Sequence, residues 1–156
     1  MGKPALTARG KFITVEGGEG AGKSTQVALL VEALGRAGTA AQATREPGGS
    51  PGAEAIRGLL LQGDNERWDA VGEALLLYAA RHDHVARTIE PALEAGRWVV
   101  CDRFTDSTIA YQGYGRGLPL AELSALQRFA LGDFRPDLTL ILDLPVDVGL
   151  ARAASR

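Results

Sequence analysis

The run from Gly17 to Ser24 is the feature that most constrains this chain. It reads GGEGAGKS and fits the pattern G-x-x-x-x-G-K-[ST]. An apolar, β-branched stretch at 12–15 precedes it, and apolar residues return at helical spacing over 27–34. A strand, a glycine-rich turn and a helix in this order bring backbone N–H groups and a helix N-terminus to one point, which suits a phosphate group. The run therefore predicts a phosphate-binding loop, with Lys23 following the phosphates and the Ser24 hydroxyl available to Mg²⁺.

Short apolar or β-branched runs alternate with longer stretches of helical periodicity along the whole chain. The runs that we predict as strands are 12–15, 39–44, 98–101 and 138–142, and the predicted helices are about 23–34, 53–61, 69–94, 106–112, 120–131 and 147–155. Pro91 should kink or split the long helix. This alternation favours an α/β fold, a parallel sheet flanked by helices on both faces.

Composition is close to that of an ordinary globular protein, so we expect a single domain over residues 1–156. A net charge of −2 gives no general attraction to nucleic acid or to an anionic membrane. Cys101 is the one cysteine of the sequence, which excludes an internal disulfide. The sequence has neither a secretory signal pattern nor a long apolar run, and we expect a cytoplasmic protein.

Charged residues follow three of the predicted strands, at the edge where parallel α/β sheets bind ligands. Asp102 and Arg103 come after WVVC, so Asp102 could hold Mg²⁺ through water and Arg103 could face a second phosphate. Glu46 follows the strand at 39–44 within REPGG. Asp143 follows the strand at 138–142, as an acidic strand end or as part of a helix-entry turn with Pro145.

With the motifs TREPGG, EALLLYAAR, VVCDRF, DSTIAYQGYGRG and GDFRPDLTLILDL, the chain resembles the bacterial thymidylate kinases, a family of P-loop nucleoside monophosphate kinases. The resemblance implies a P-loop NTPase fold of the adenylate-kinase type with a five-stranded parallel core. It implies direct in-line transfer of the ATP γ-phosphoryl group to dTMP, with Mg²⁺ as the essential ion, in a homodimer. Because only four strands are predicted and the sequence stops inside a basic helical stretch, we expect a truncated chain, which by the resemblance lacks the C-terminal LID and last strand. A naturally short protein ending on a helix is the alternative.

The resemblance carries the family's functional residues to positions in this sequence. For ATP it implies Gly17, Gly18, Glu19, Gly20, Ala21, Gly22, Lys23, Ser24 and Thr25. For dTMP it implies Glu19, Glu46, Arg57, Leu77, Arg81, Arg103, Thr108, Tyr111 and Gln112. For catalysis it implies Lys23, Arg103 and the LID arginine Arg156, with Arg152 as a secondary candidate, and for the metal Ser24 and Asp102.

The chemistry of these residues agrees with the roles that the resemblance implies. Arg57 and Arg103 would bind the dTMP phosphate with two guanidinium groups. Arg81 would donate to thymine O4, where cytosine presents a donor amino group instead. Glu19 would meet the sugar 3′-hydroxyl, and Glu46 would lie near the metal and its water.

The remaining roles concern the base and the sugar. Thr108 and Gln112 would bond the base edge and sugar region, and Tyr111 would crowd out a ribose 2′-hydroxyl. The chain has Leu77 where the family usually has an aromatic residue that stacks on thymine, so either Leu77 covers the ring or Tyr78 swings in. We expect the neighbouring histidines His82 and His84 to be solvated helix residues.

Three other functions compete with this interpretation. A different nucleoside or nucleotide kinase could use the same scaffold. A nucleotide-hydrolysing switch would need an N-K-x-D segment to read guanine, and the sequence has none. A purely structural domain would leave Lys23, Arg81, Asp102 and Arg103 unexplained together.

Overall fold

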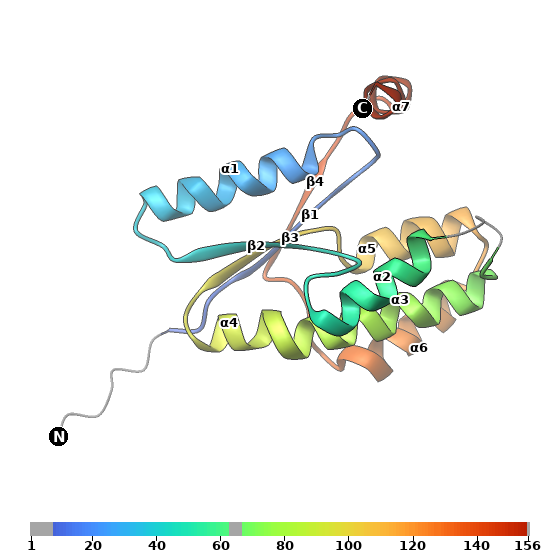
Figure 1. Ribbon diagram of the computed structural model, residues 1–156, viewed down its shortest axis with the longest axis horizontal. Helices are drawn as coiled ribbons and strands as arrows, with labels where there is room; N and C mark the ends of the chain where they lie inside the picture. The colour runs from blue at the N-terminus through green and yellow to red at the C-terminus, as the bar shows by residue number, and fades with distance from the viewer. Residues whose placement is uncertain (1–7, 63–66, 156) are drawn as a thin grey trace.

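A parallel sheet between layers of helices forms the centre of the computed structural model, which describes residues 8–62 and 67–155 (Figure 1). Its strands are β1 (Phe12–Gly17), β2 (Ala41–Arg45), β3 (Trp98–Asp102) and β4 (Leu138–Leu142). They lie in the order β2-β3-β1-β4, and each neighbouring pair is parallel. The predicted α/β fold is confirmed, with four strands in the described part of the chain.

The helices occupy the positions that the sequence periodicity predicts. They are α1 (Lys23–Arg36), α2 (Pro51–Leu61), α3 (Ala70–His84), α4 (Glu90–Glu94), α5 (Thr105–Thr108), α6 (Leu120–Leu131) and α7 (Val146–Ala154), with π-helical segments η1 (Val85–Ile89) and η2 (Ile109–Gly115). None of those described is long and apolar enough to cross a membrane.

The long predicted helix at 69–94 is helical over residues 70–94 but changes its hydrogen-bonding pattern. It runs as α3, then η1, then α4, with Pro91 in the first turn of α4. Proline has no N–H to donate and its ring clashes with the preceding turn, so the α-helical ladder is interrupted at this point. At Pro91, where a kink or split was predicted, the helix changes type from η1 to α4 without a gap in the helical residues. The predicted helix at 106–112 differs, since it is one turn of α5 followed by η2.

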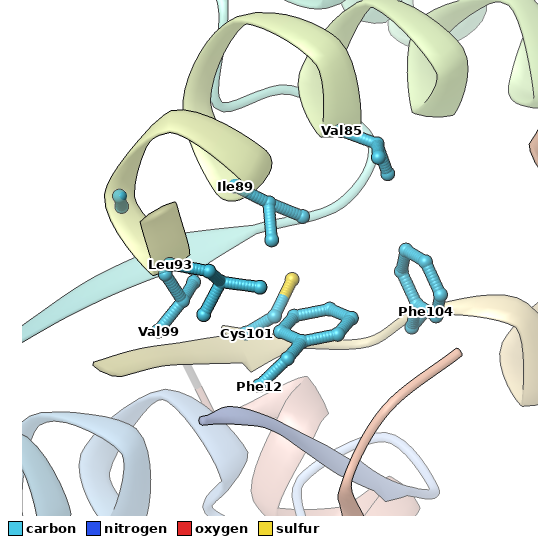
Figure 2. Packing of buried hydrophobic residues seen from close by; sticks show 8 residues of the cluster. Phe12, Val85, Ile89, Leu93, Val99, Cys101 and Phe104 are labelled. Carbon is cyan, nitrogen blue, oxygen red and sulfur yellow. The ribbon is translucent and has the colours of Figure 1, made fainter. Parts of the chain in front are cut away.

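The strands bury a different side-chain set on each face of the sheet. On one face, Val15 of β1 and Val100 of β3 pack against Val27 of α1. On the other face a cluster closes under η1 and α4 (Figure 2), and it consists of Phe12, Val85, Ile89, Ala92, Leu93, Val99, Cys101 and Phe104. Because successive residues of β3 point to opposite faces, Val100 belongs to the first set, whereas Val99 and Cys101 belong to the second.

The register of the sheet aligns the carboxyl ends of three strands. Asp102 of β3 pairs with Val15 of β1 on one side and with Arg45 of β2 on the other. The backbone continues this pairing one step beyond the strands, since Arg103 N donates to Val15 O (3.0 Å) and Glu46 N donates to Asp102 O (2.9 Å). The glycine-rich loop, the Asp102–Arg103 pair and the Glu46 segment therefore meet at one edge.

Candidate active site

The glycine-rich loop turns directly from β1 into α1. Gly20 and Gly22 have φ values of 70° and 88°, in the left-handed region that glycine adopts at low cost. A side chain at Gly20 would also run into the carbonyl oxygen of Gly149, because α7 packs backbone to backbone against the loop. Glycine is therefore required at this position both by the turn and by the neighbouring helix.

Lys23 lies at the start of α1 with its ammonium group turned into the loop. Nζ donates to the carbonyl oxygens of Gly17 (2.9 Å) and Gly18 (2.7 Å). Burial lowers the pKa of Lys23 below its ordinary value, and the positive charge of Arg103 acts in the same direction, while nearby carboxylates including Asp102 oppose them. A bound phosphate would favour the charged ammonium form, which is the form that phosphate binding needs.

The two residues predicted to bind a metal are in contact. Ser24 Oγ donates to Asp102 Oδ2 at 2.6 Å, across the gap between α1 and the end of β3. A hydroxyl and a carboxylate are the hard oxygen ligands that Mg²⁺ prefers, and Mg²⁺ completes its shell with water and substrate phosphates. The donor set at this point therefore fits Mg²⁺.

Arg103 projects from the end of β3 over the loop. Its Nη2 donates to Glu19 Oε1 (2.5 Å), its Nη1 donates to Ser107 Oγ (3.2 Å), and its Cζ lies 5.3 Å from the ring centre of Tyr111. Its backbone has a φ of 70°, a left-handed conformation that costs a non-glycine residue about 1–2 kcal/mol. Strained backbone of this kind is concentrated at functional sites, where it fixes the direction of a side chain.

Glu16 is a residue that the motifs and periodicity of the sequence did not single out. Its buried carboxylate accepts hydrogen bonds from Phe104 N (2.7 Å) and from Ser107 Oγ (2.6 Å), so it caps the start of α5 beside Arg103. The signal was present, since a carboxylate in the otherwise apolar strand FITVE needs a partner if it is buried. Glu16 thus ties the strand before the loop to the backbone that carries Arg103.

Arg81 lies on α3 deep in the protein, in a second cleft. Nε donates to Glu46 Oε2 at 2.6 Å, and Nη2 donates to Phe104 O (3.1 Å) and to Thr108 Oγ1 (3.0 Å). The aromatic rings of Tyr78 and Phe104 flank the guanidinium, at 4.9 and 5.2 Å from Cζ to each ring centre. Within the described part of the chain, the remaining nitrogen, Nη1, is buried without a hydrogen-bond partner. A buried donor of this kind fits an acceptor supplied by a ligand.

Glu46 and His84 are buried and bonded to each other. Both carboxylate oxygens of Glu46 are bonded to protein, Oε2 to Arg81 and Oε1 to His84 Nδ1 (3.0 Å). Glu46 also lines the cleft that contains Ser24 and Asp102, and its place near the metal and its water stays a prediction. The expectation that His84 is solvated is wrong, because its side chain is 0% exposed. His82 is exposed as expected, and its ring bonds Ala130 O. His84 is buried because it follows Arg81 by three residues and so shares its inward helix face.

Leu77 and Tyr78 take different places relative to the inner cleft. Leu77 lines it, whereas Tyr78 is buried beneath, packed with Ala74 and Leu123. Burial raises the pKa of the Tyr78 phenol above its ordinary value. Of the two possibilities for covering a base, this arrangement favours Leu77.

Two adjoining clefts bring most of the predicted residues together. The outer cleft, of about 460 Å³, is lined by Glu19, Gly20, Gly22, Lys23, Ser24, Thr25, Arg45, Glu46, Pro47, Arg57, Leu61, Asp102 and Arg103. The inner cleft, of about 250 Å³, is lined by Glu19, Glu46, Pro47, Leu60, Leu61, Glu73, Leu77, Arg81, Arg103, Phe104, Ser107, Thr108, Tyr111 and Gln112. They share Glu19, Glu46, Pro47, Leu61 and Arg103, so the clefts meet beside the guanidinium of Arg103.

The other predicted site residues are placed as follows. Gly17, Gly18 and Ala21 belong to the loop but do not line the outer cleft. Arg57 lines it and donates to Pro47 O at 2.7 Å. Arg156 lies outside the described residues, so the catalytic role that the resemblance implies for it stays a prediction.

Known proteins with a similar sequence show which family this chain belongs to. A family model described as thymidylate kinase matches residues 15–156. The chain belongs to the thymidylate kinase family. It is 60% identical over 149 residues to the thymidylate kinase of Rhodopseudomonas palustris strain TIE-1, an alignment that covers 95% of this chain and 65% of that protein. The chain thus spans about two thirds of the length of this thymidylate kinase.

Other thymidylate kinases give a similar result. That of Pseudomonas fluorescens strain Pf-5 is 60% identical over 147 residues, covering 94% of this chain and 70% of that protein. The crystal structure of thymidylate kinase from Ehrlichia chaffeensis superimposes with a TM-score of 0.81 at 38% identity, covering 94% of this chain and 83% of that one. The family and fold implied by the sequence motifs are confirmed.

The strained backbone at Arg103 generates the first prediction. Arg103→Ala and Arg103→Gly both remove the guanidinium, but only glycine relieves the left-handed conformation. The glycine variant should therefore have a free energy of unfolding about 1 kcal/mol above that of the alanine variant, measured by denaturant titration.

Arg87, an exposed residue of η1, provides the matched control. There the order should be reversed, with Arg87→Gly less stable than Arg87→Ala by about 1 kcal/mol, because glycine is unfavourable within a helix. If glycine were the less stable replacement at both positions, the backbone of Arg103 would not be strained.

Proposed function

We propose that this protein transfers the γ-phosphoryl group of ATP to the phosphate of dTMP, giving dTDP and ADP. One observation carries the proposal: the phosphate-loop cleft and the inner cleft beside Arg81 meet at Arg103 and Glu19. Two nucleotides bound in these clefts would point their phosphates at the same guanidinium. The name of the relatives, thymidylate kinase, supports this choice of acceptor.

On the donor side, the loop and the start of α1 would hold the ATP phosphates. Lys23 would exchange its two loop carbonyl partners for phosphate oxygens, at the helix N-terminus where negative charge is favoured. Ser24 and Asp102 would hold Mg²⁺, which when bound neutralises phosphate charge and orients the phosphate chain. These residues position the γ-phosphoryl group and lower the cost of its charge.

On the acceptor side, Arg57 and Arg103 would bind the dTMP phosphate. One of its oxygens would attack the γ-phosphorus as the bond to the β-phosphate oxygen breaks, and no strong base is needed because the attacking oxygen is already anionic. Arg103 lies where both phosphates meet, so its charge would stabilise the transferring group in the transition state. The ion pair with Glu19 would open for this role.

The inner cleft would hold the thymidine part of dTMP. Arg81 Nη1, the buried donor that lacks a partner among the described residues, would donate to thymine O4. Leu77 would cover the ring, with Thr108 and Gln112 at the base edge and sugar region. Tyr111, whose hydroxyl donates to Glu19 Oε1 at 3.2 Å, would close the space beside the sugar. Cytosine would present an amino donor to Arg81, leaving two donors facing each other.

An acceptor screen tests this proposal. With ATP and Mg²⁺, dTDP should form from dTMP, and dTMP should bind at least about fivefold more tightly than dCMP in calorimetry, since one unmatched buried donor costs about 1–3 kcal/mol. Arg81→Gln should reduce this preference, because an amide can present its oxygen to the cytosine amino group. Arg87→Gln, the same substitution at an exposed position, should leave the preference for dTMP over dCMP unaltered.

Two results would contradict the proposal. If dTMP and dCMP bound equally well to the wild-type protein, the inner cleft would not read the base. If dTMP yielded no dTDP while another nucleoside monophosphate was phosphorylated, the acceptor would be that nucleotide.

We further propose that the protein forms a homodimer through the face of α3 and α6. A groove of about 580 Å³ lies there, lined by Val71, Ala74, Leu75, Leu118, Pro119, Glu122, Leu123, Ala125, Leu126 and Phe129. Phe129 is 90% exposed, and Val71 and Leu75 are more than half exposed. Since α3 also carries Arg81, a dimer formed through this face would support the inner cleft from behind.

Sedimentation velocity tests the dimer. The wild-type protein should sediment as a dimer, whereas Phe129→Lys should give monomers, because an ammonium group would be buried without a partner. Leu29→Lys on α1, an exposed leucine on the other face of the sheet, is the control and should remain dimeric. A wild-type monomer, or an unchanged dimer with Phe129→Lys, would contradict this interface.

A further inference from the structure

The buried ring of His84 connects β2 to the arginine of the inner cleft. Its Nε2 lies 2.7 Å from Thr44 Oγ1, and its Nδ1 lies 3.0 Å from Glu46 Oε1. The ring is fully buried and lines neither of the two clefts. His84 can therefore act on a ligand only through the residues that it touches.

The partners of the ring assign its protons. A carboxylate can only accept, so the hydrogen of His84 lies on Nδ1 and points to Glu46. In the neutral ring Nε2 is then an acceptor, and the Thr44 hydroxyl donates to it. The carboxylate of Glu46 thus sets the tautomer, the Thr44 hydroxyl adapts to it as the donor, and the ring presents one defined donor to Glu46.

The loop after β2 is built around this ring. Gly49 has a φ of 86°, and a side chain there would collide with both His84 Nε2 and Thr44 Oγ1. Thr88 of η1 donates to Gly49 O at 2.7 Å, which holds the loop over the ring. Contacts with Thr44, Glu46 and Gly49 consequently hold His84 in place.

We propose that His84 is a positioning residue that keeps Arg81 directed at the nucleotide base. Because His84 occupies Oε1 of Glu46, the carboxylate meets the guanidinium through Oε2 and Nε. A carboxylate with both oxygens available favours a two-point contact with a guanidinium. On this side of Arg81 that contact would use Nε and Nη2.

Such a two-point contact would disturb the inner cleft. It would draw Nη2 away from Phe104 O and from Thr108 Oγ1, its present partners. The guanidinium would turn, and Nη1 would no longer face the base. This inference rests on the proposed function in one respect, namely that Nη1 meets the base of the bound nucleotide.

Two substitutions test the contacts of the two ring nitrogens one at a time. His84→Asn keeps an N–H donor as far along the side chain as Nδ1, so it preserves the contact with Glu46 and loses that with Thr44. His84→Gln places its amide at the reach of Nε2, so it preserves the contact with Thr44 and leaves Glu46 Oε1 free. Both variants remove the ring and should lose similar thermal stability. A difference between them in dTMP binding therefore reports which contact of the ring was lost.

Calorimetry on the whole chain should distinguish them. His84→Gln should raise the Kd for dTMP about tenfold and reduce the preference for dTMP over dCMP, the effect of one lost buried hydrogen bond. His84→Asn should keep the Kd for dTMP within about threefold of the wild-type value, and the Kd for ATP should stay within about twofold in both variants. His82→Gln, the same substitution at an exposed position of the same helix, should alter neither the Kd for dTMP nor the Kd for ATP.

Equal weakening of dTMP binding by the two His84 variants, or an equal loss of ATP binding, would overturn the proposal and leave His84 a structural residue. The NMR resonance of Arg81 Nε–H, recorded without nucleotide, separates this failure from failure of the proposed function. Its chemical shift should be preserved in His84→Asn and displaced in His84→Gln. If the wild-type protein bound no dTMP, the proposed function would be wrong, and this resonance alone would decide the role of His84.

Discussion

The ion pair between Glu46 and Arg81 is the interaction on which the inner cleft depends. The side chains are 4% and 3% exposed, so both charges have left water, at a cost of several kcal/mol each. They are tolerated because neighbouring groups complete their hydrogen bonding: His84 on the carboxylate, and Phe104 O and Thr108 on the guanidinium. Among the described residues, the guanidinium nitrogen Nη1 has no hydrogen-bond partner, and under the proposed function its direction would give the cleft its preference for a base.

The parallel sheet explains why this pair lies beside a phosphate loop. Glu46 follows β2, Arg103 follows β3 and the glycine-rich loop follows β1, and the register of the three strands aligns their carboxyl ends. Glu16 adds a second link by capping α5 from the end of β1. The groups that would hold two nucleotides are thus fixed by strand ends and helix starts, whose relative positions are set by the core.

Features that depend on residues close together in the sequence were predicted correctly, whereas features that depend on distant residues were not. The phosphate loop, the order of strands and helices and the change of helix type at Pro91 depend on neighbouring residues, so periodicity and motif spacing predicted them. The environments of Glu46 and His84 depend on contacts between residues 38 positions apart, which periodicity does not encode. A histidine on an amphipathic helix looks the same from the sequence whether its face meets water or β2, and only the packing of α3 decided it.

A double-mutant cycle on the unfolding free energy tests the central claim most directly. Glu46→Gln and Arg81→Met should each destabilise the protein by about 3–5 kcal/mol, because each leaves a buried charge without its partner. The double variant should lose little more than the worse of the two single variants, since removing both charges leaves neither unpaired. Destabilisations that simply add would show that the two side chains act independently, and the inner cleft would then not depend on their ion pair.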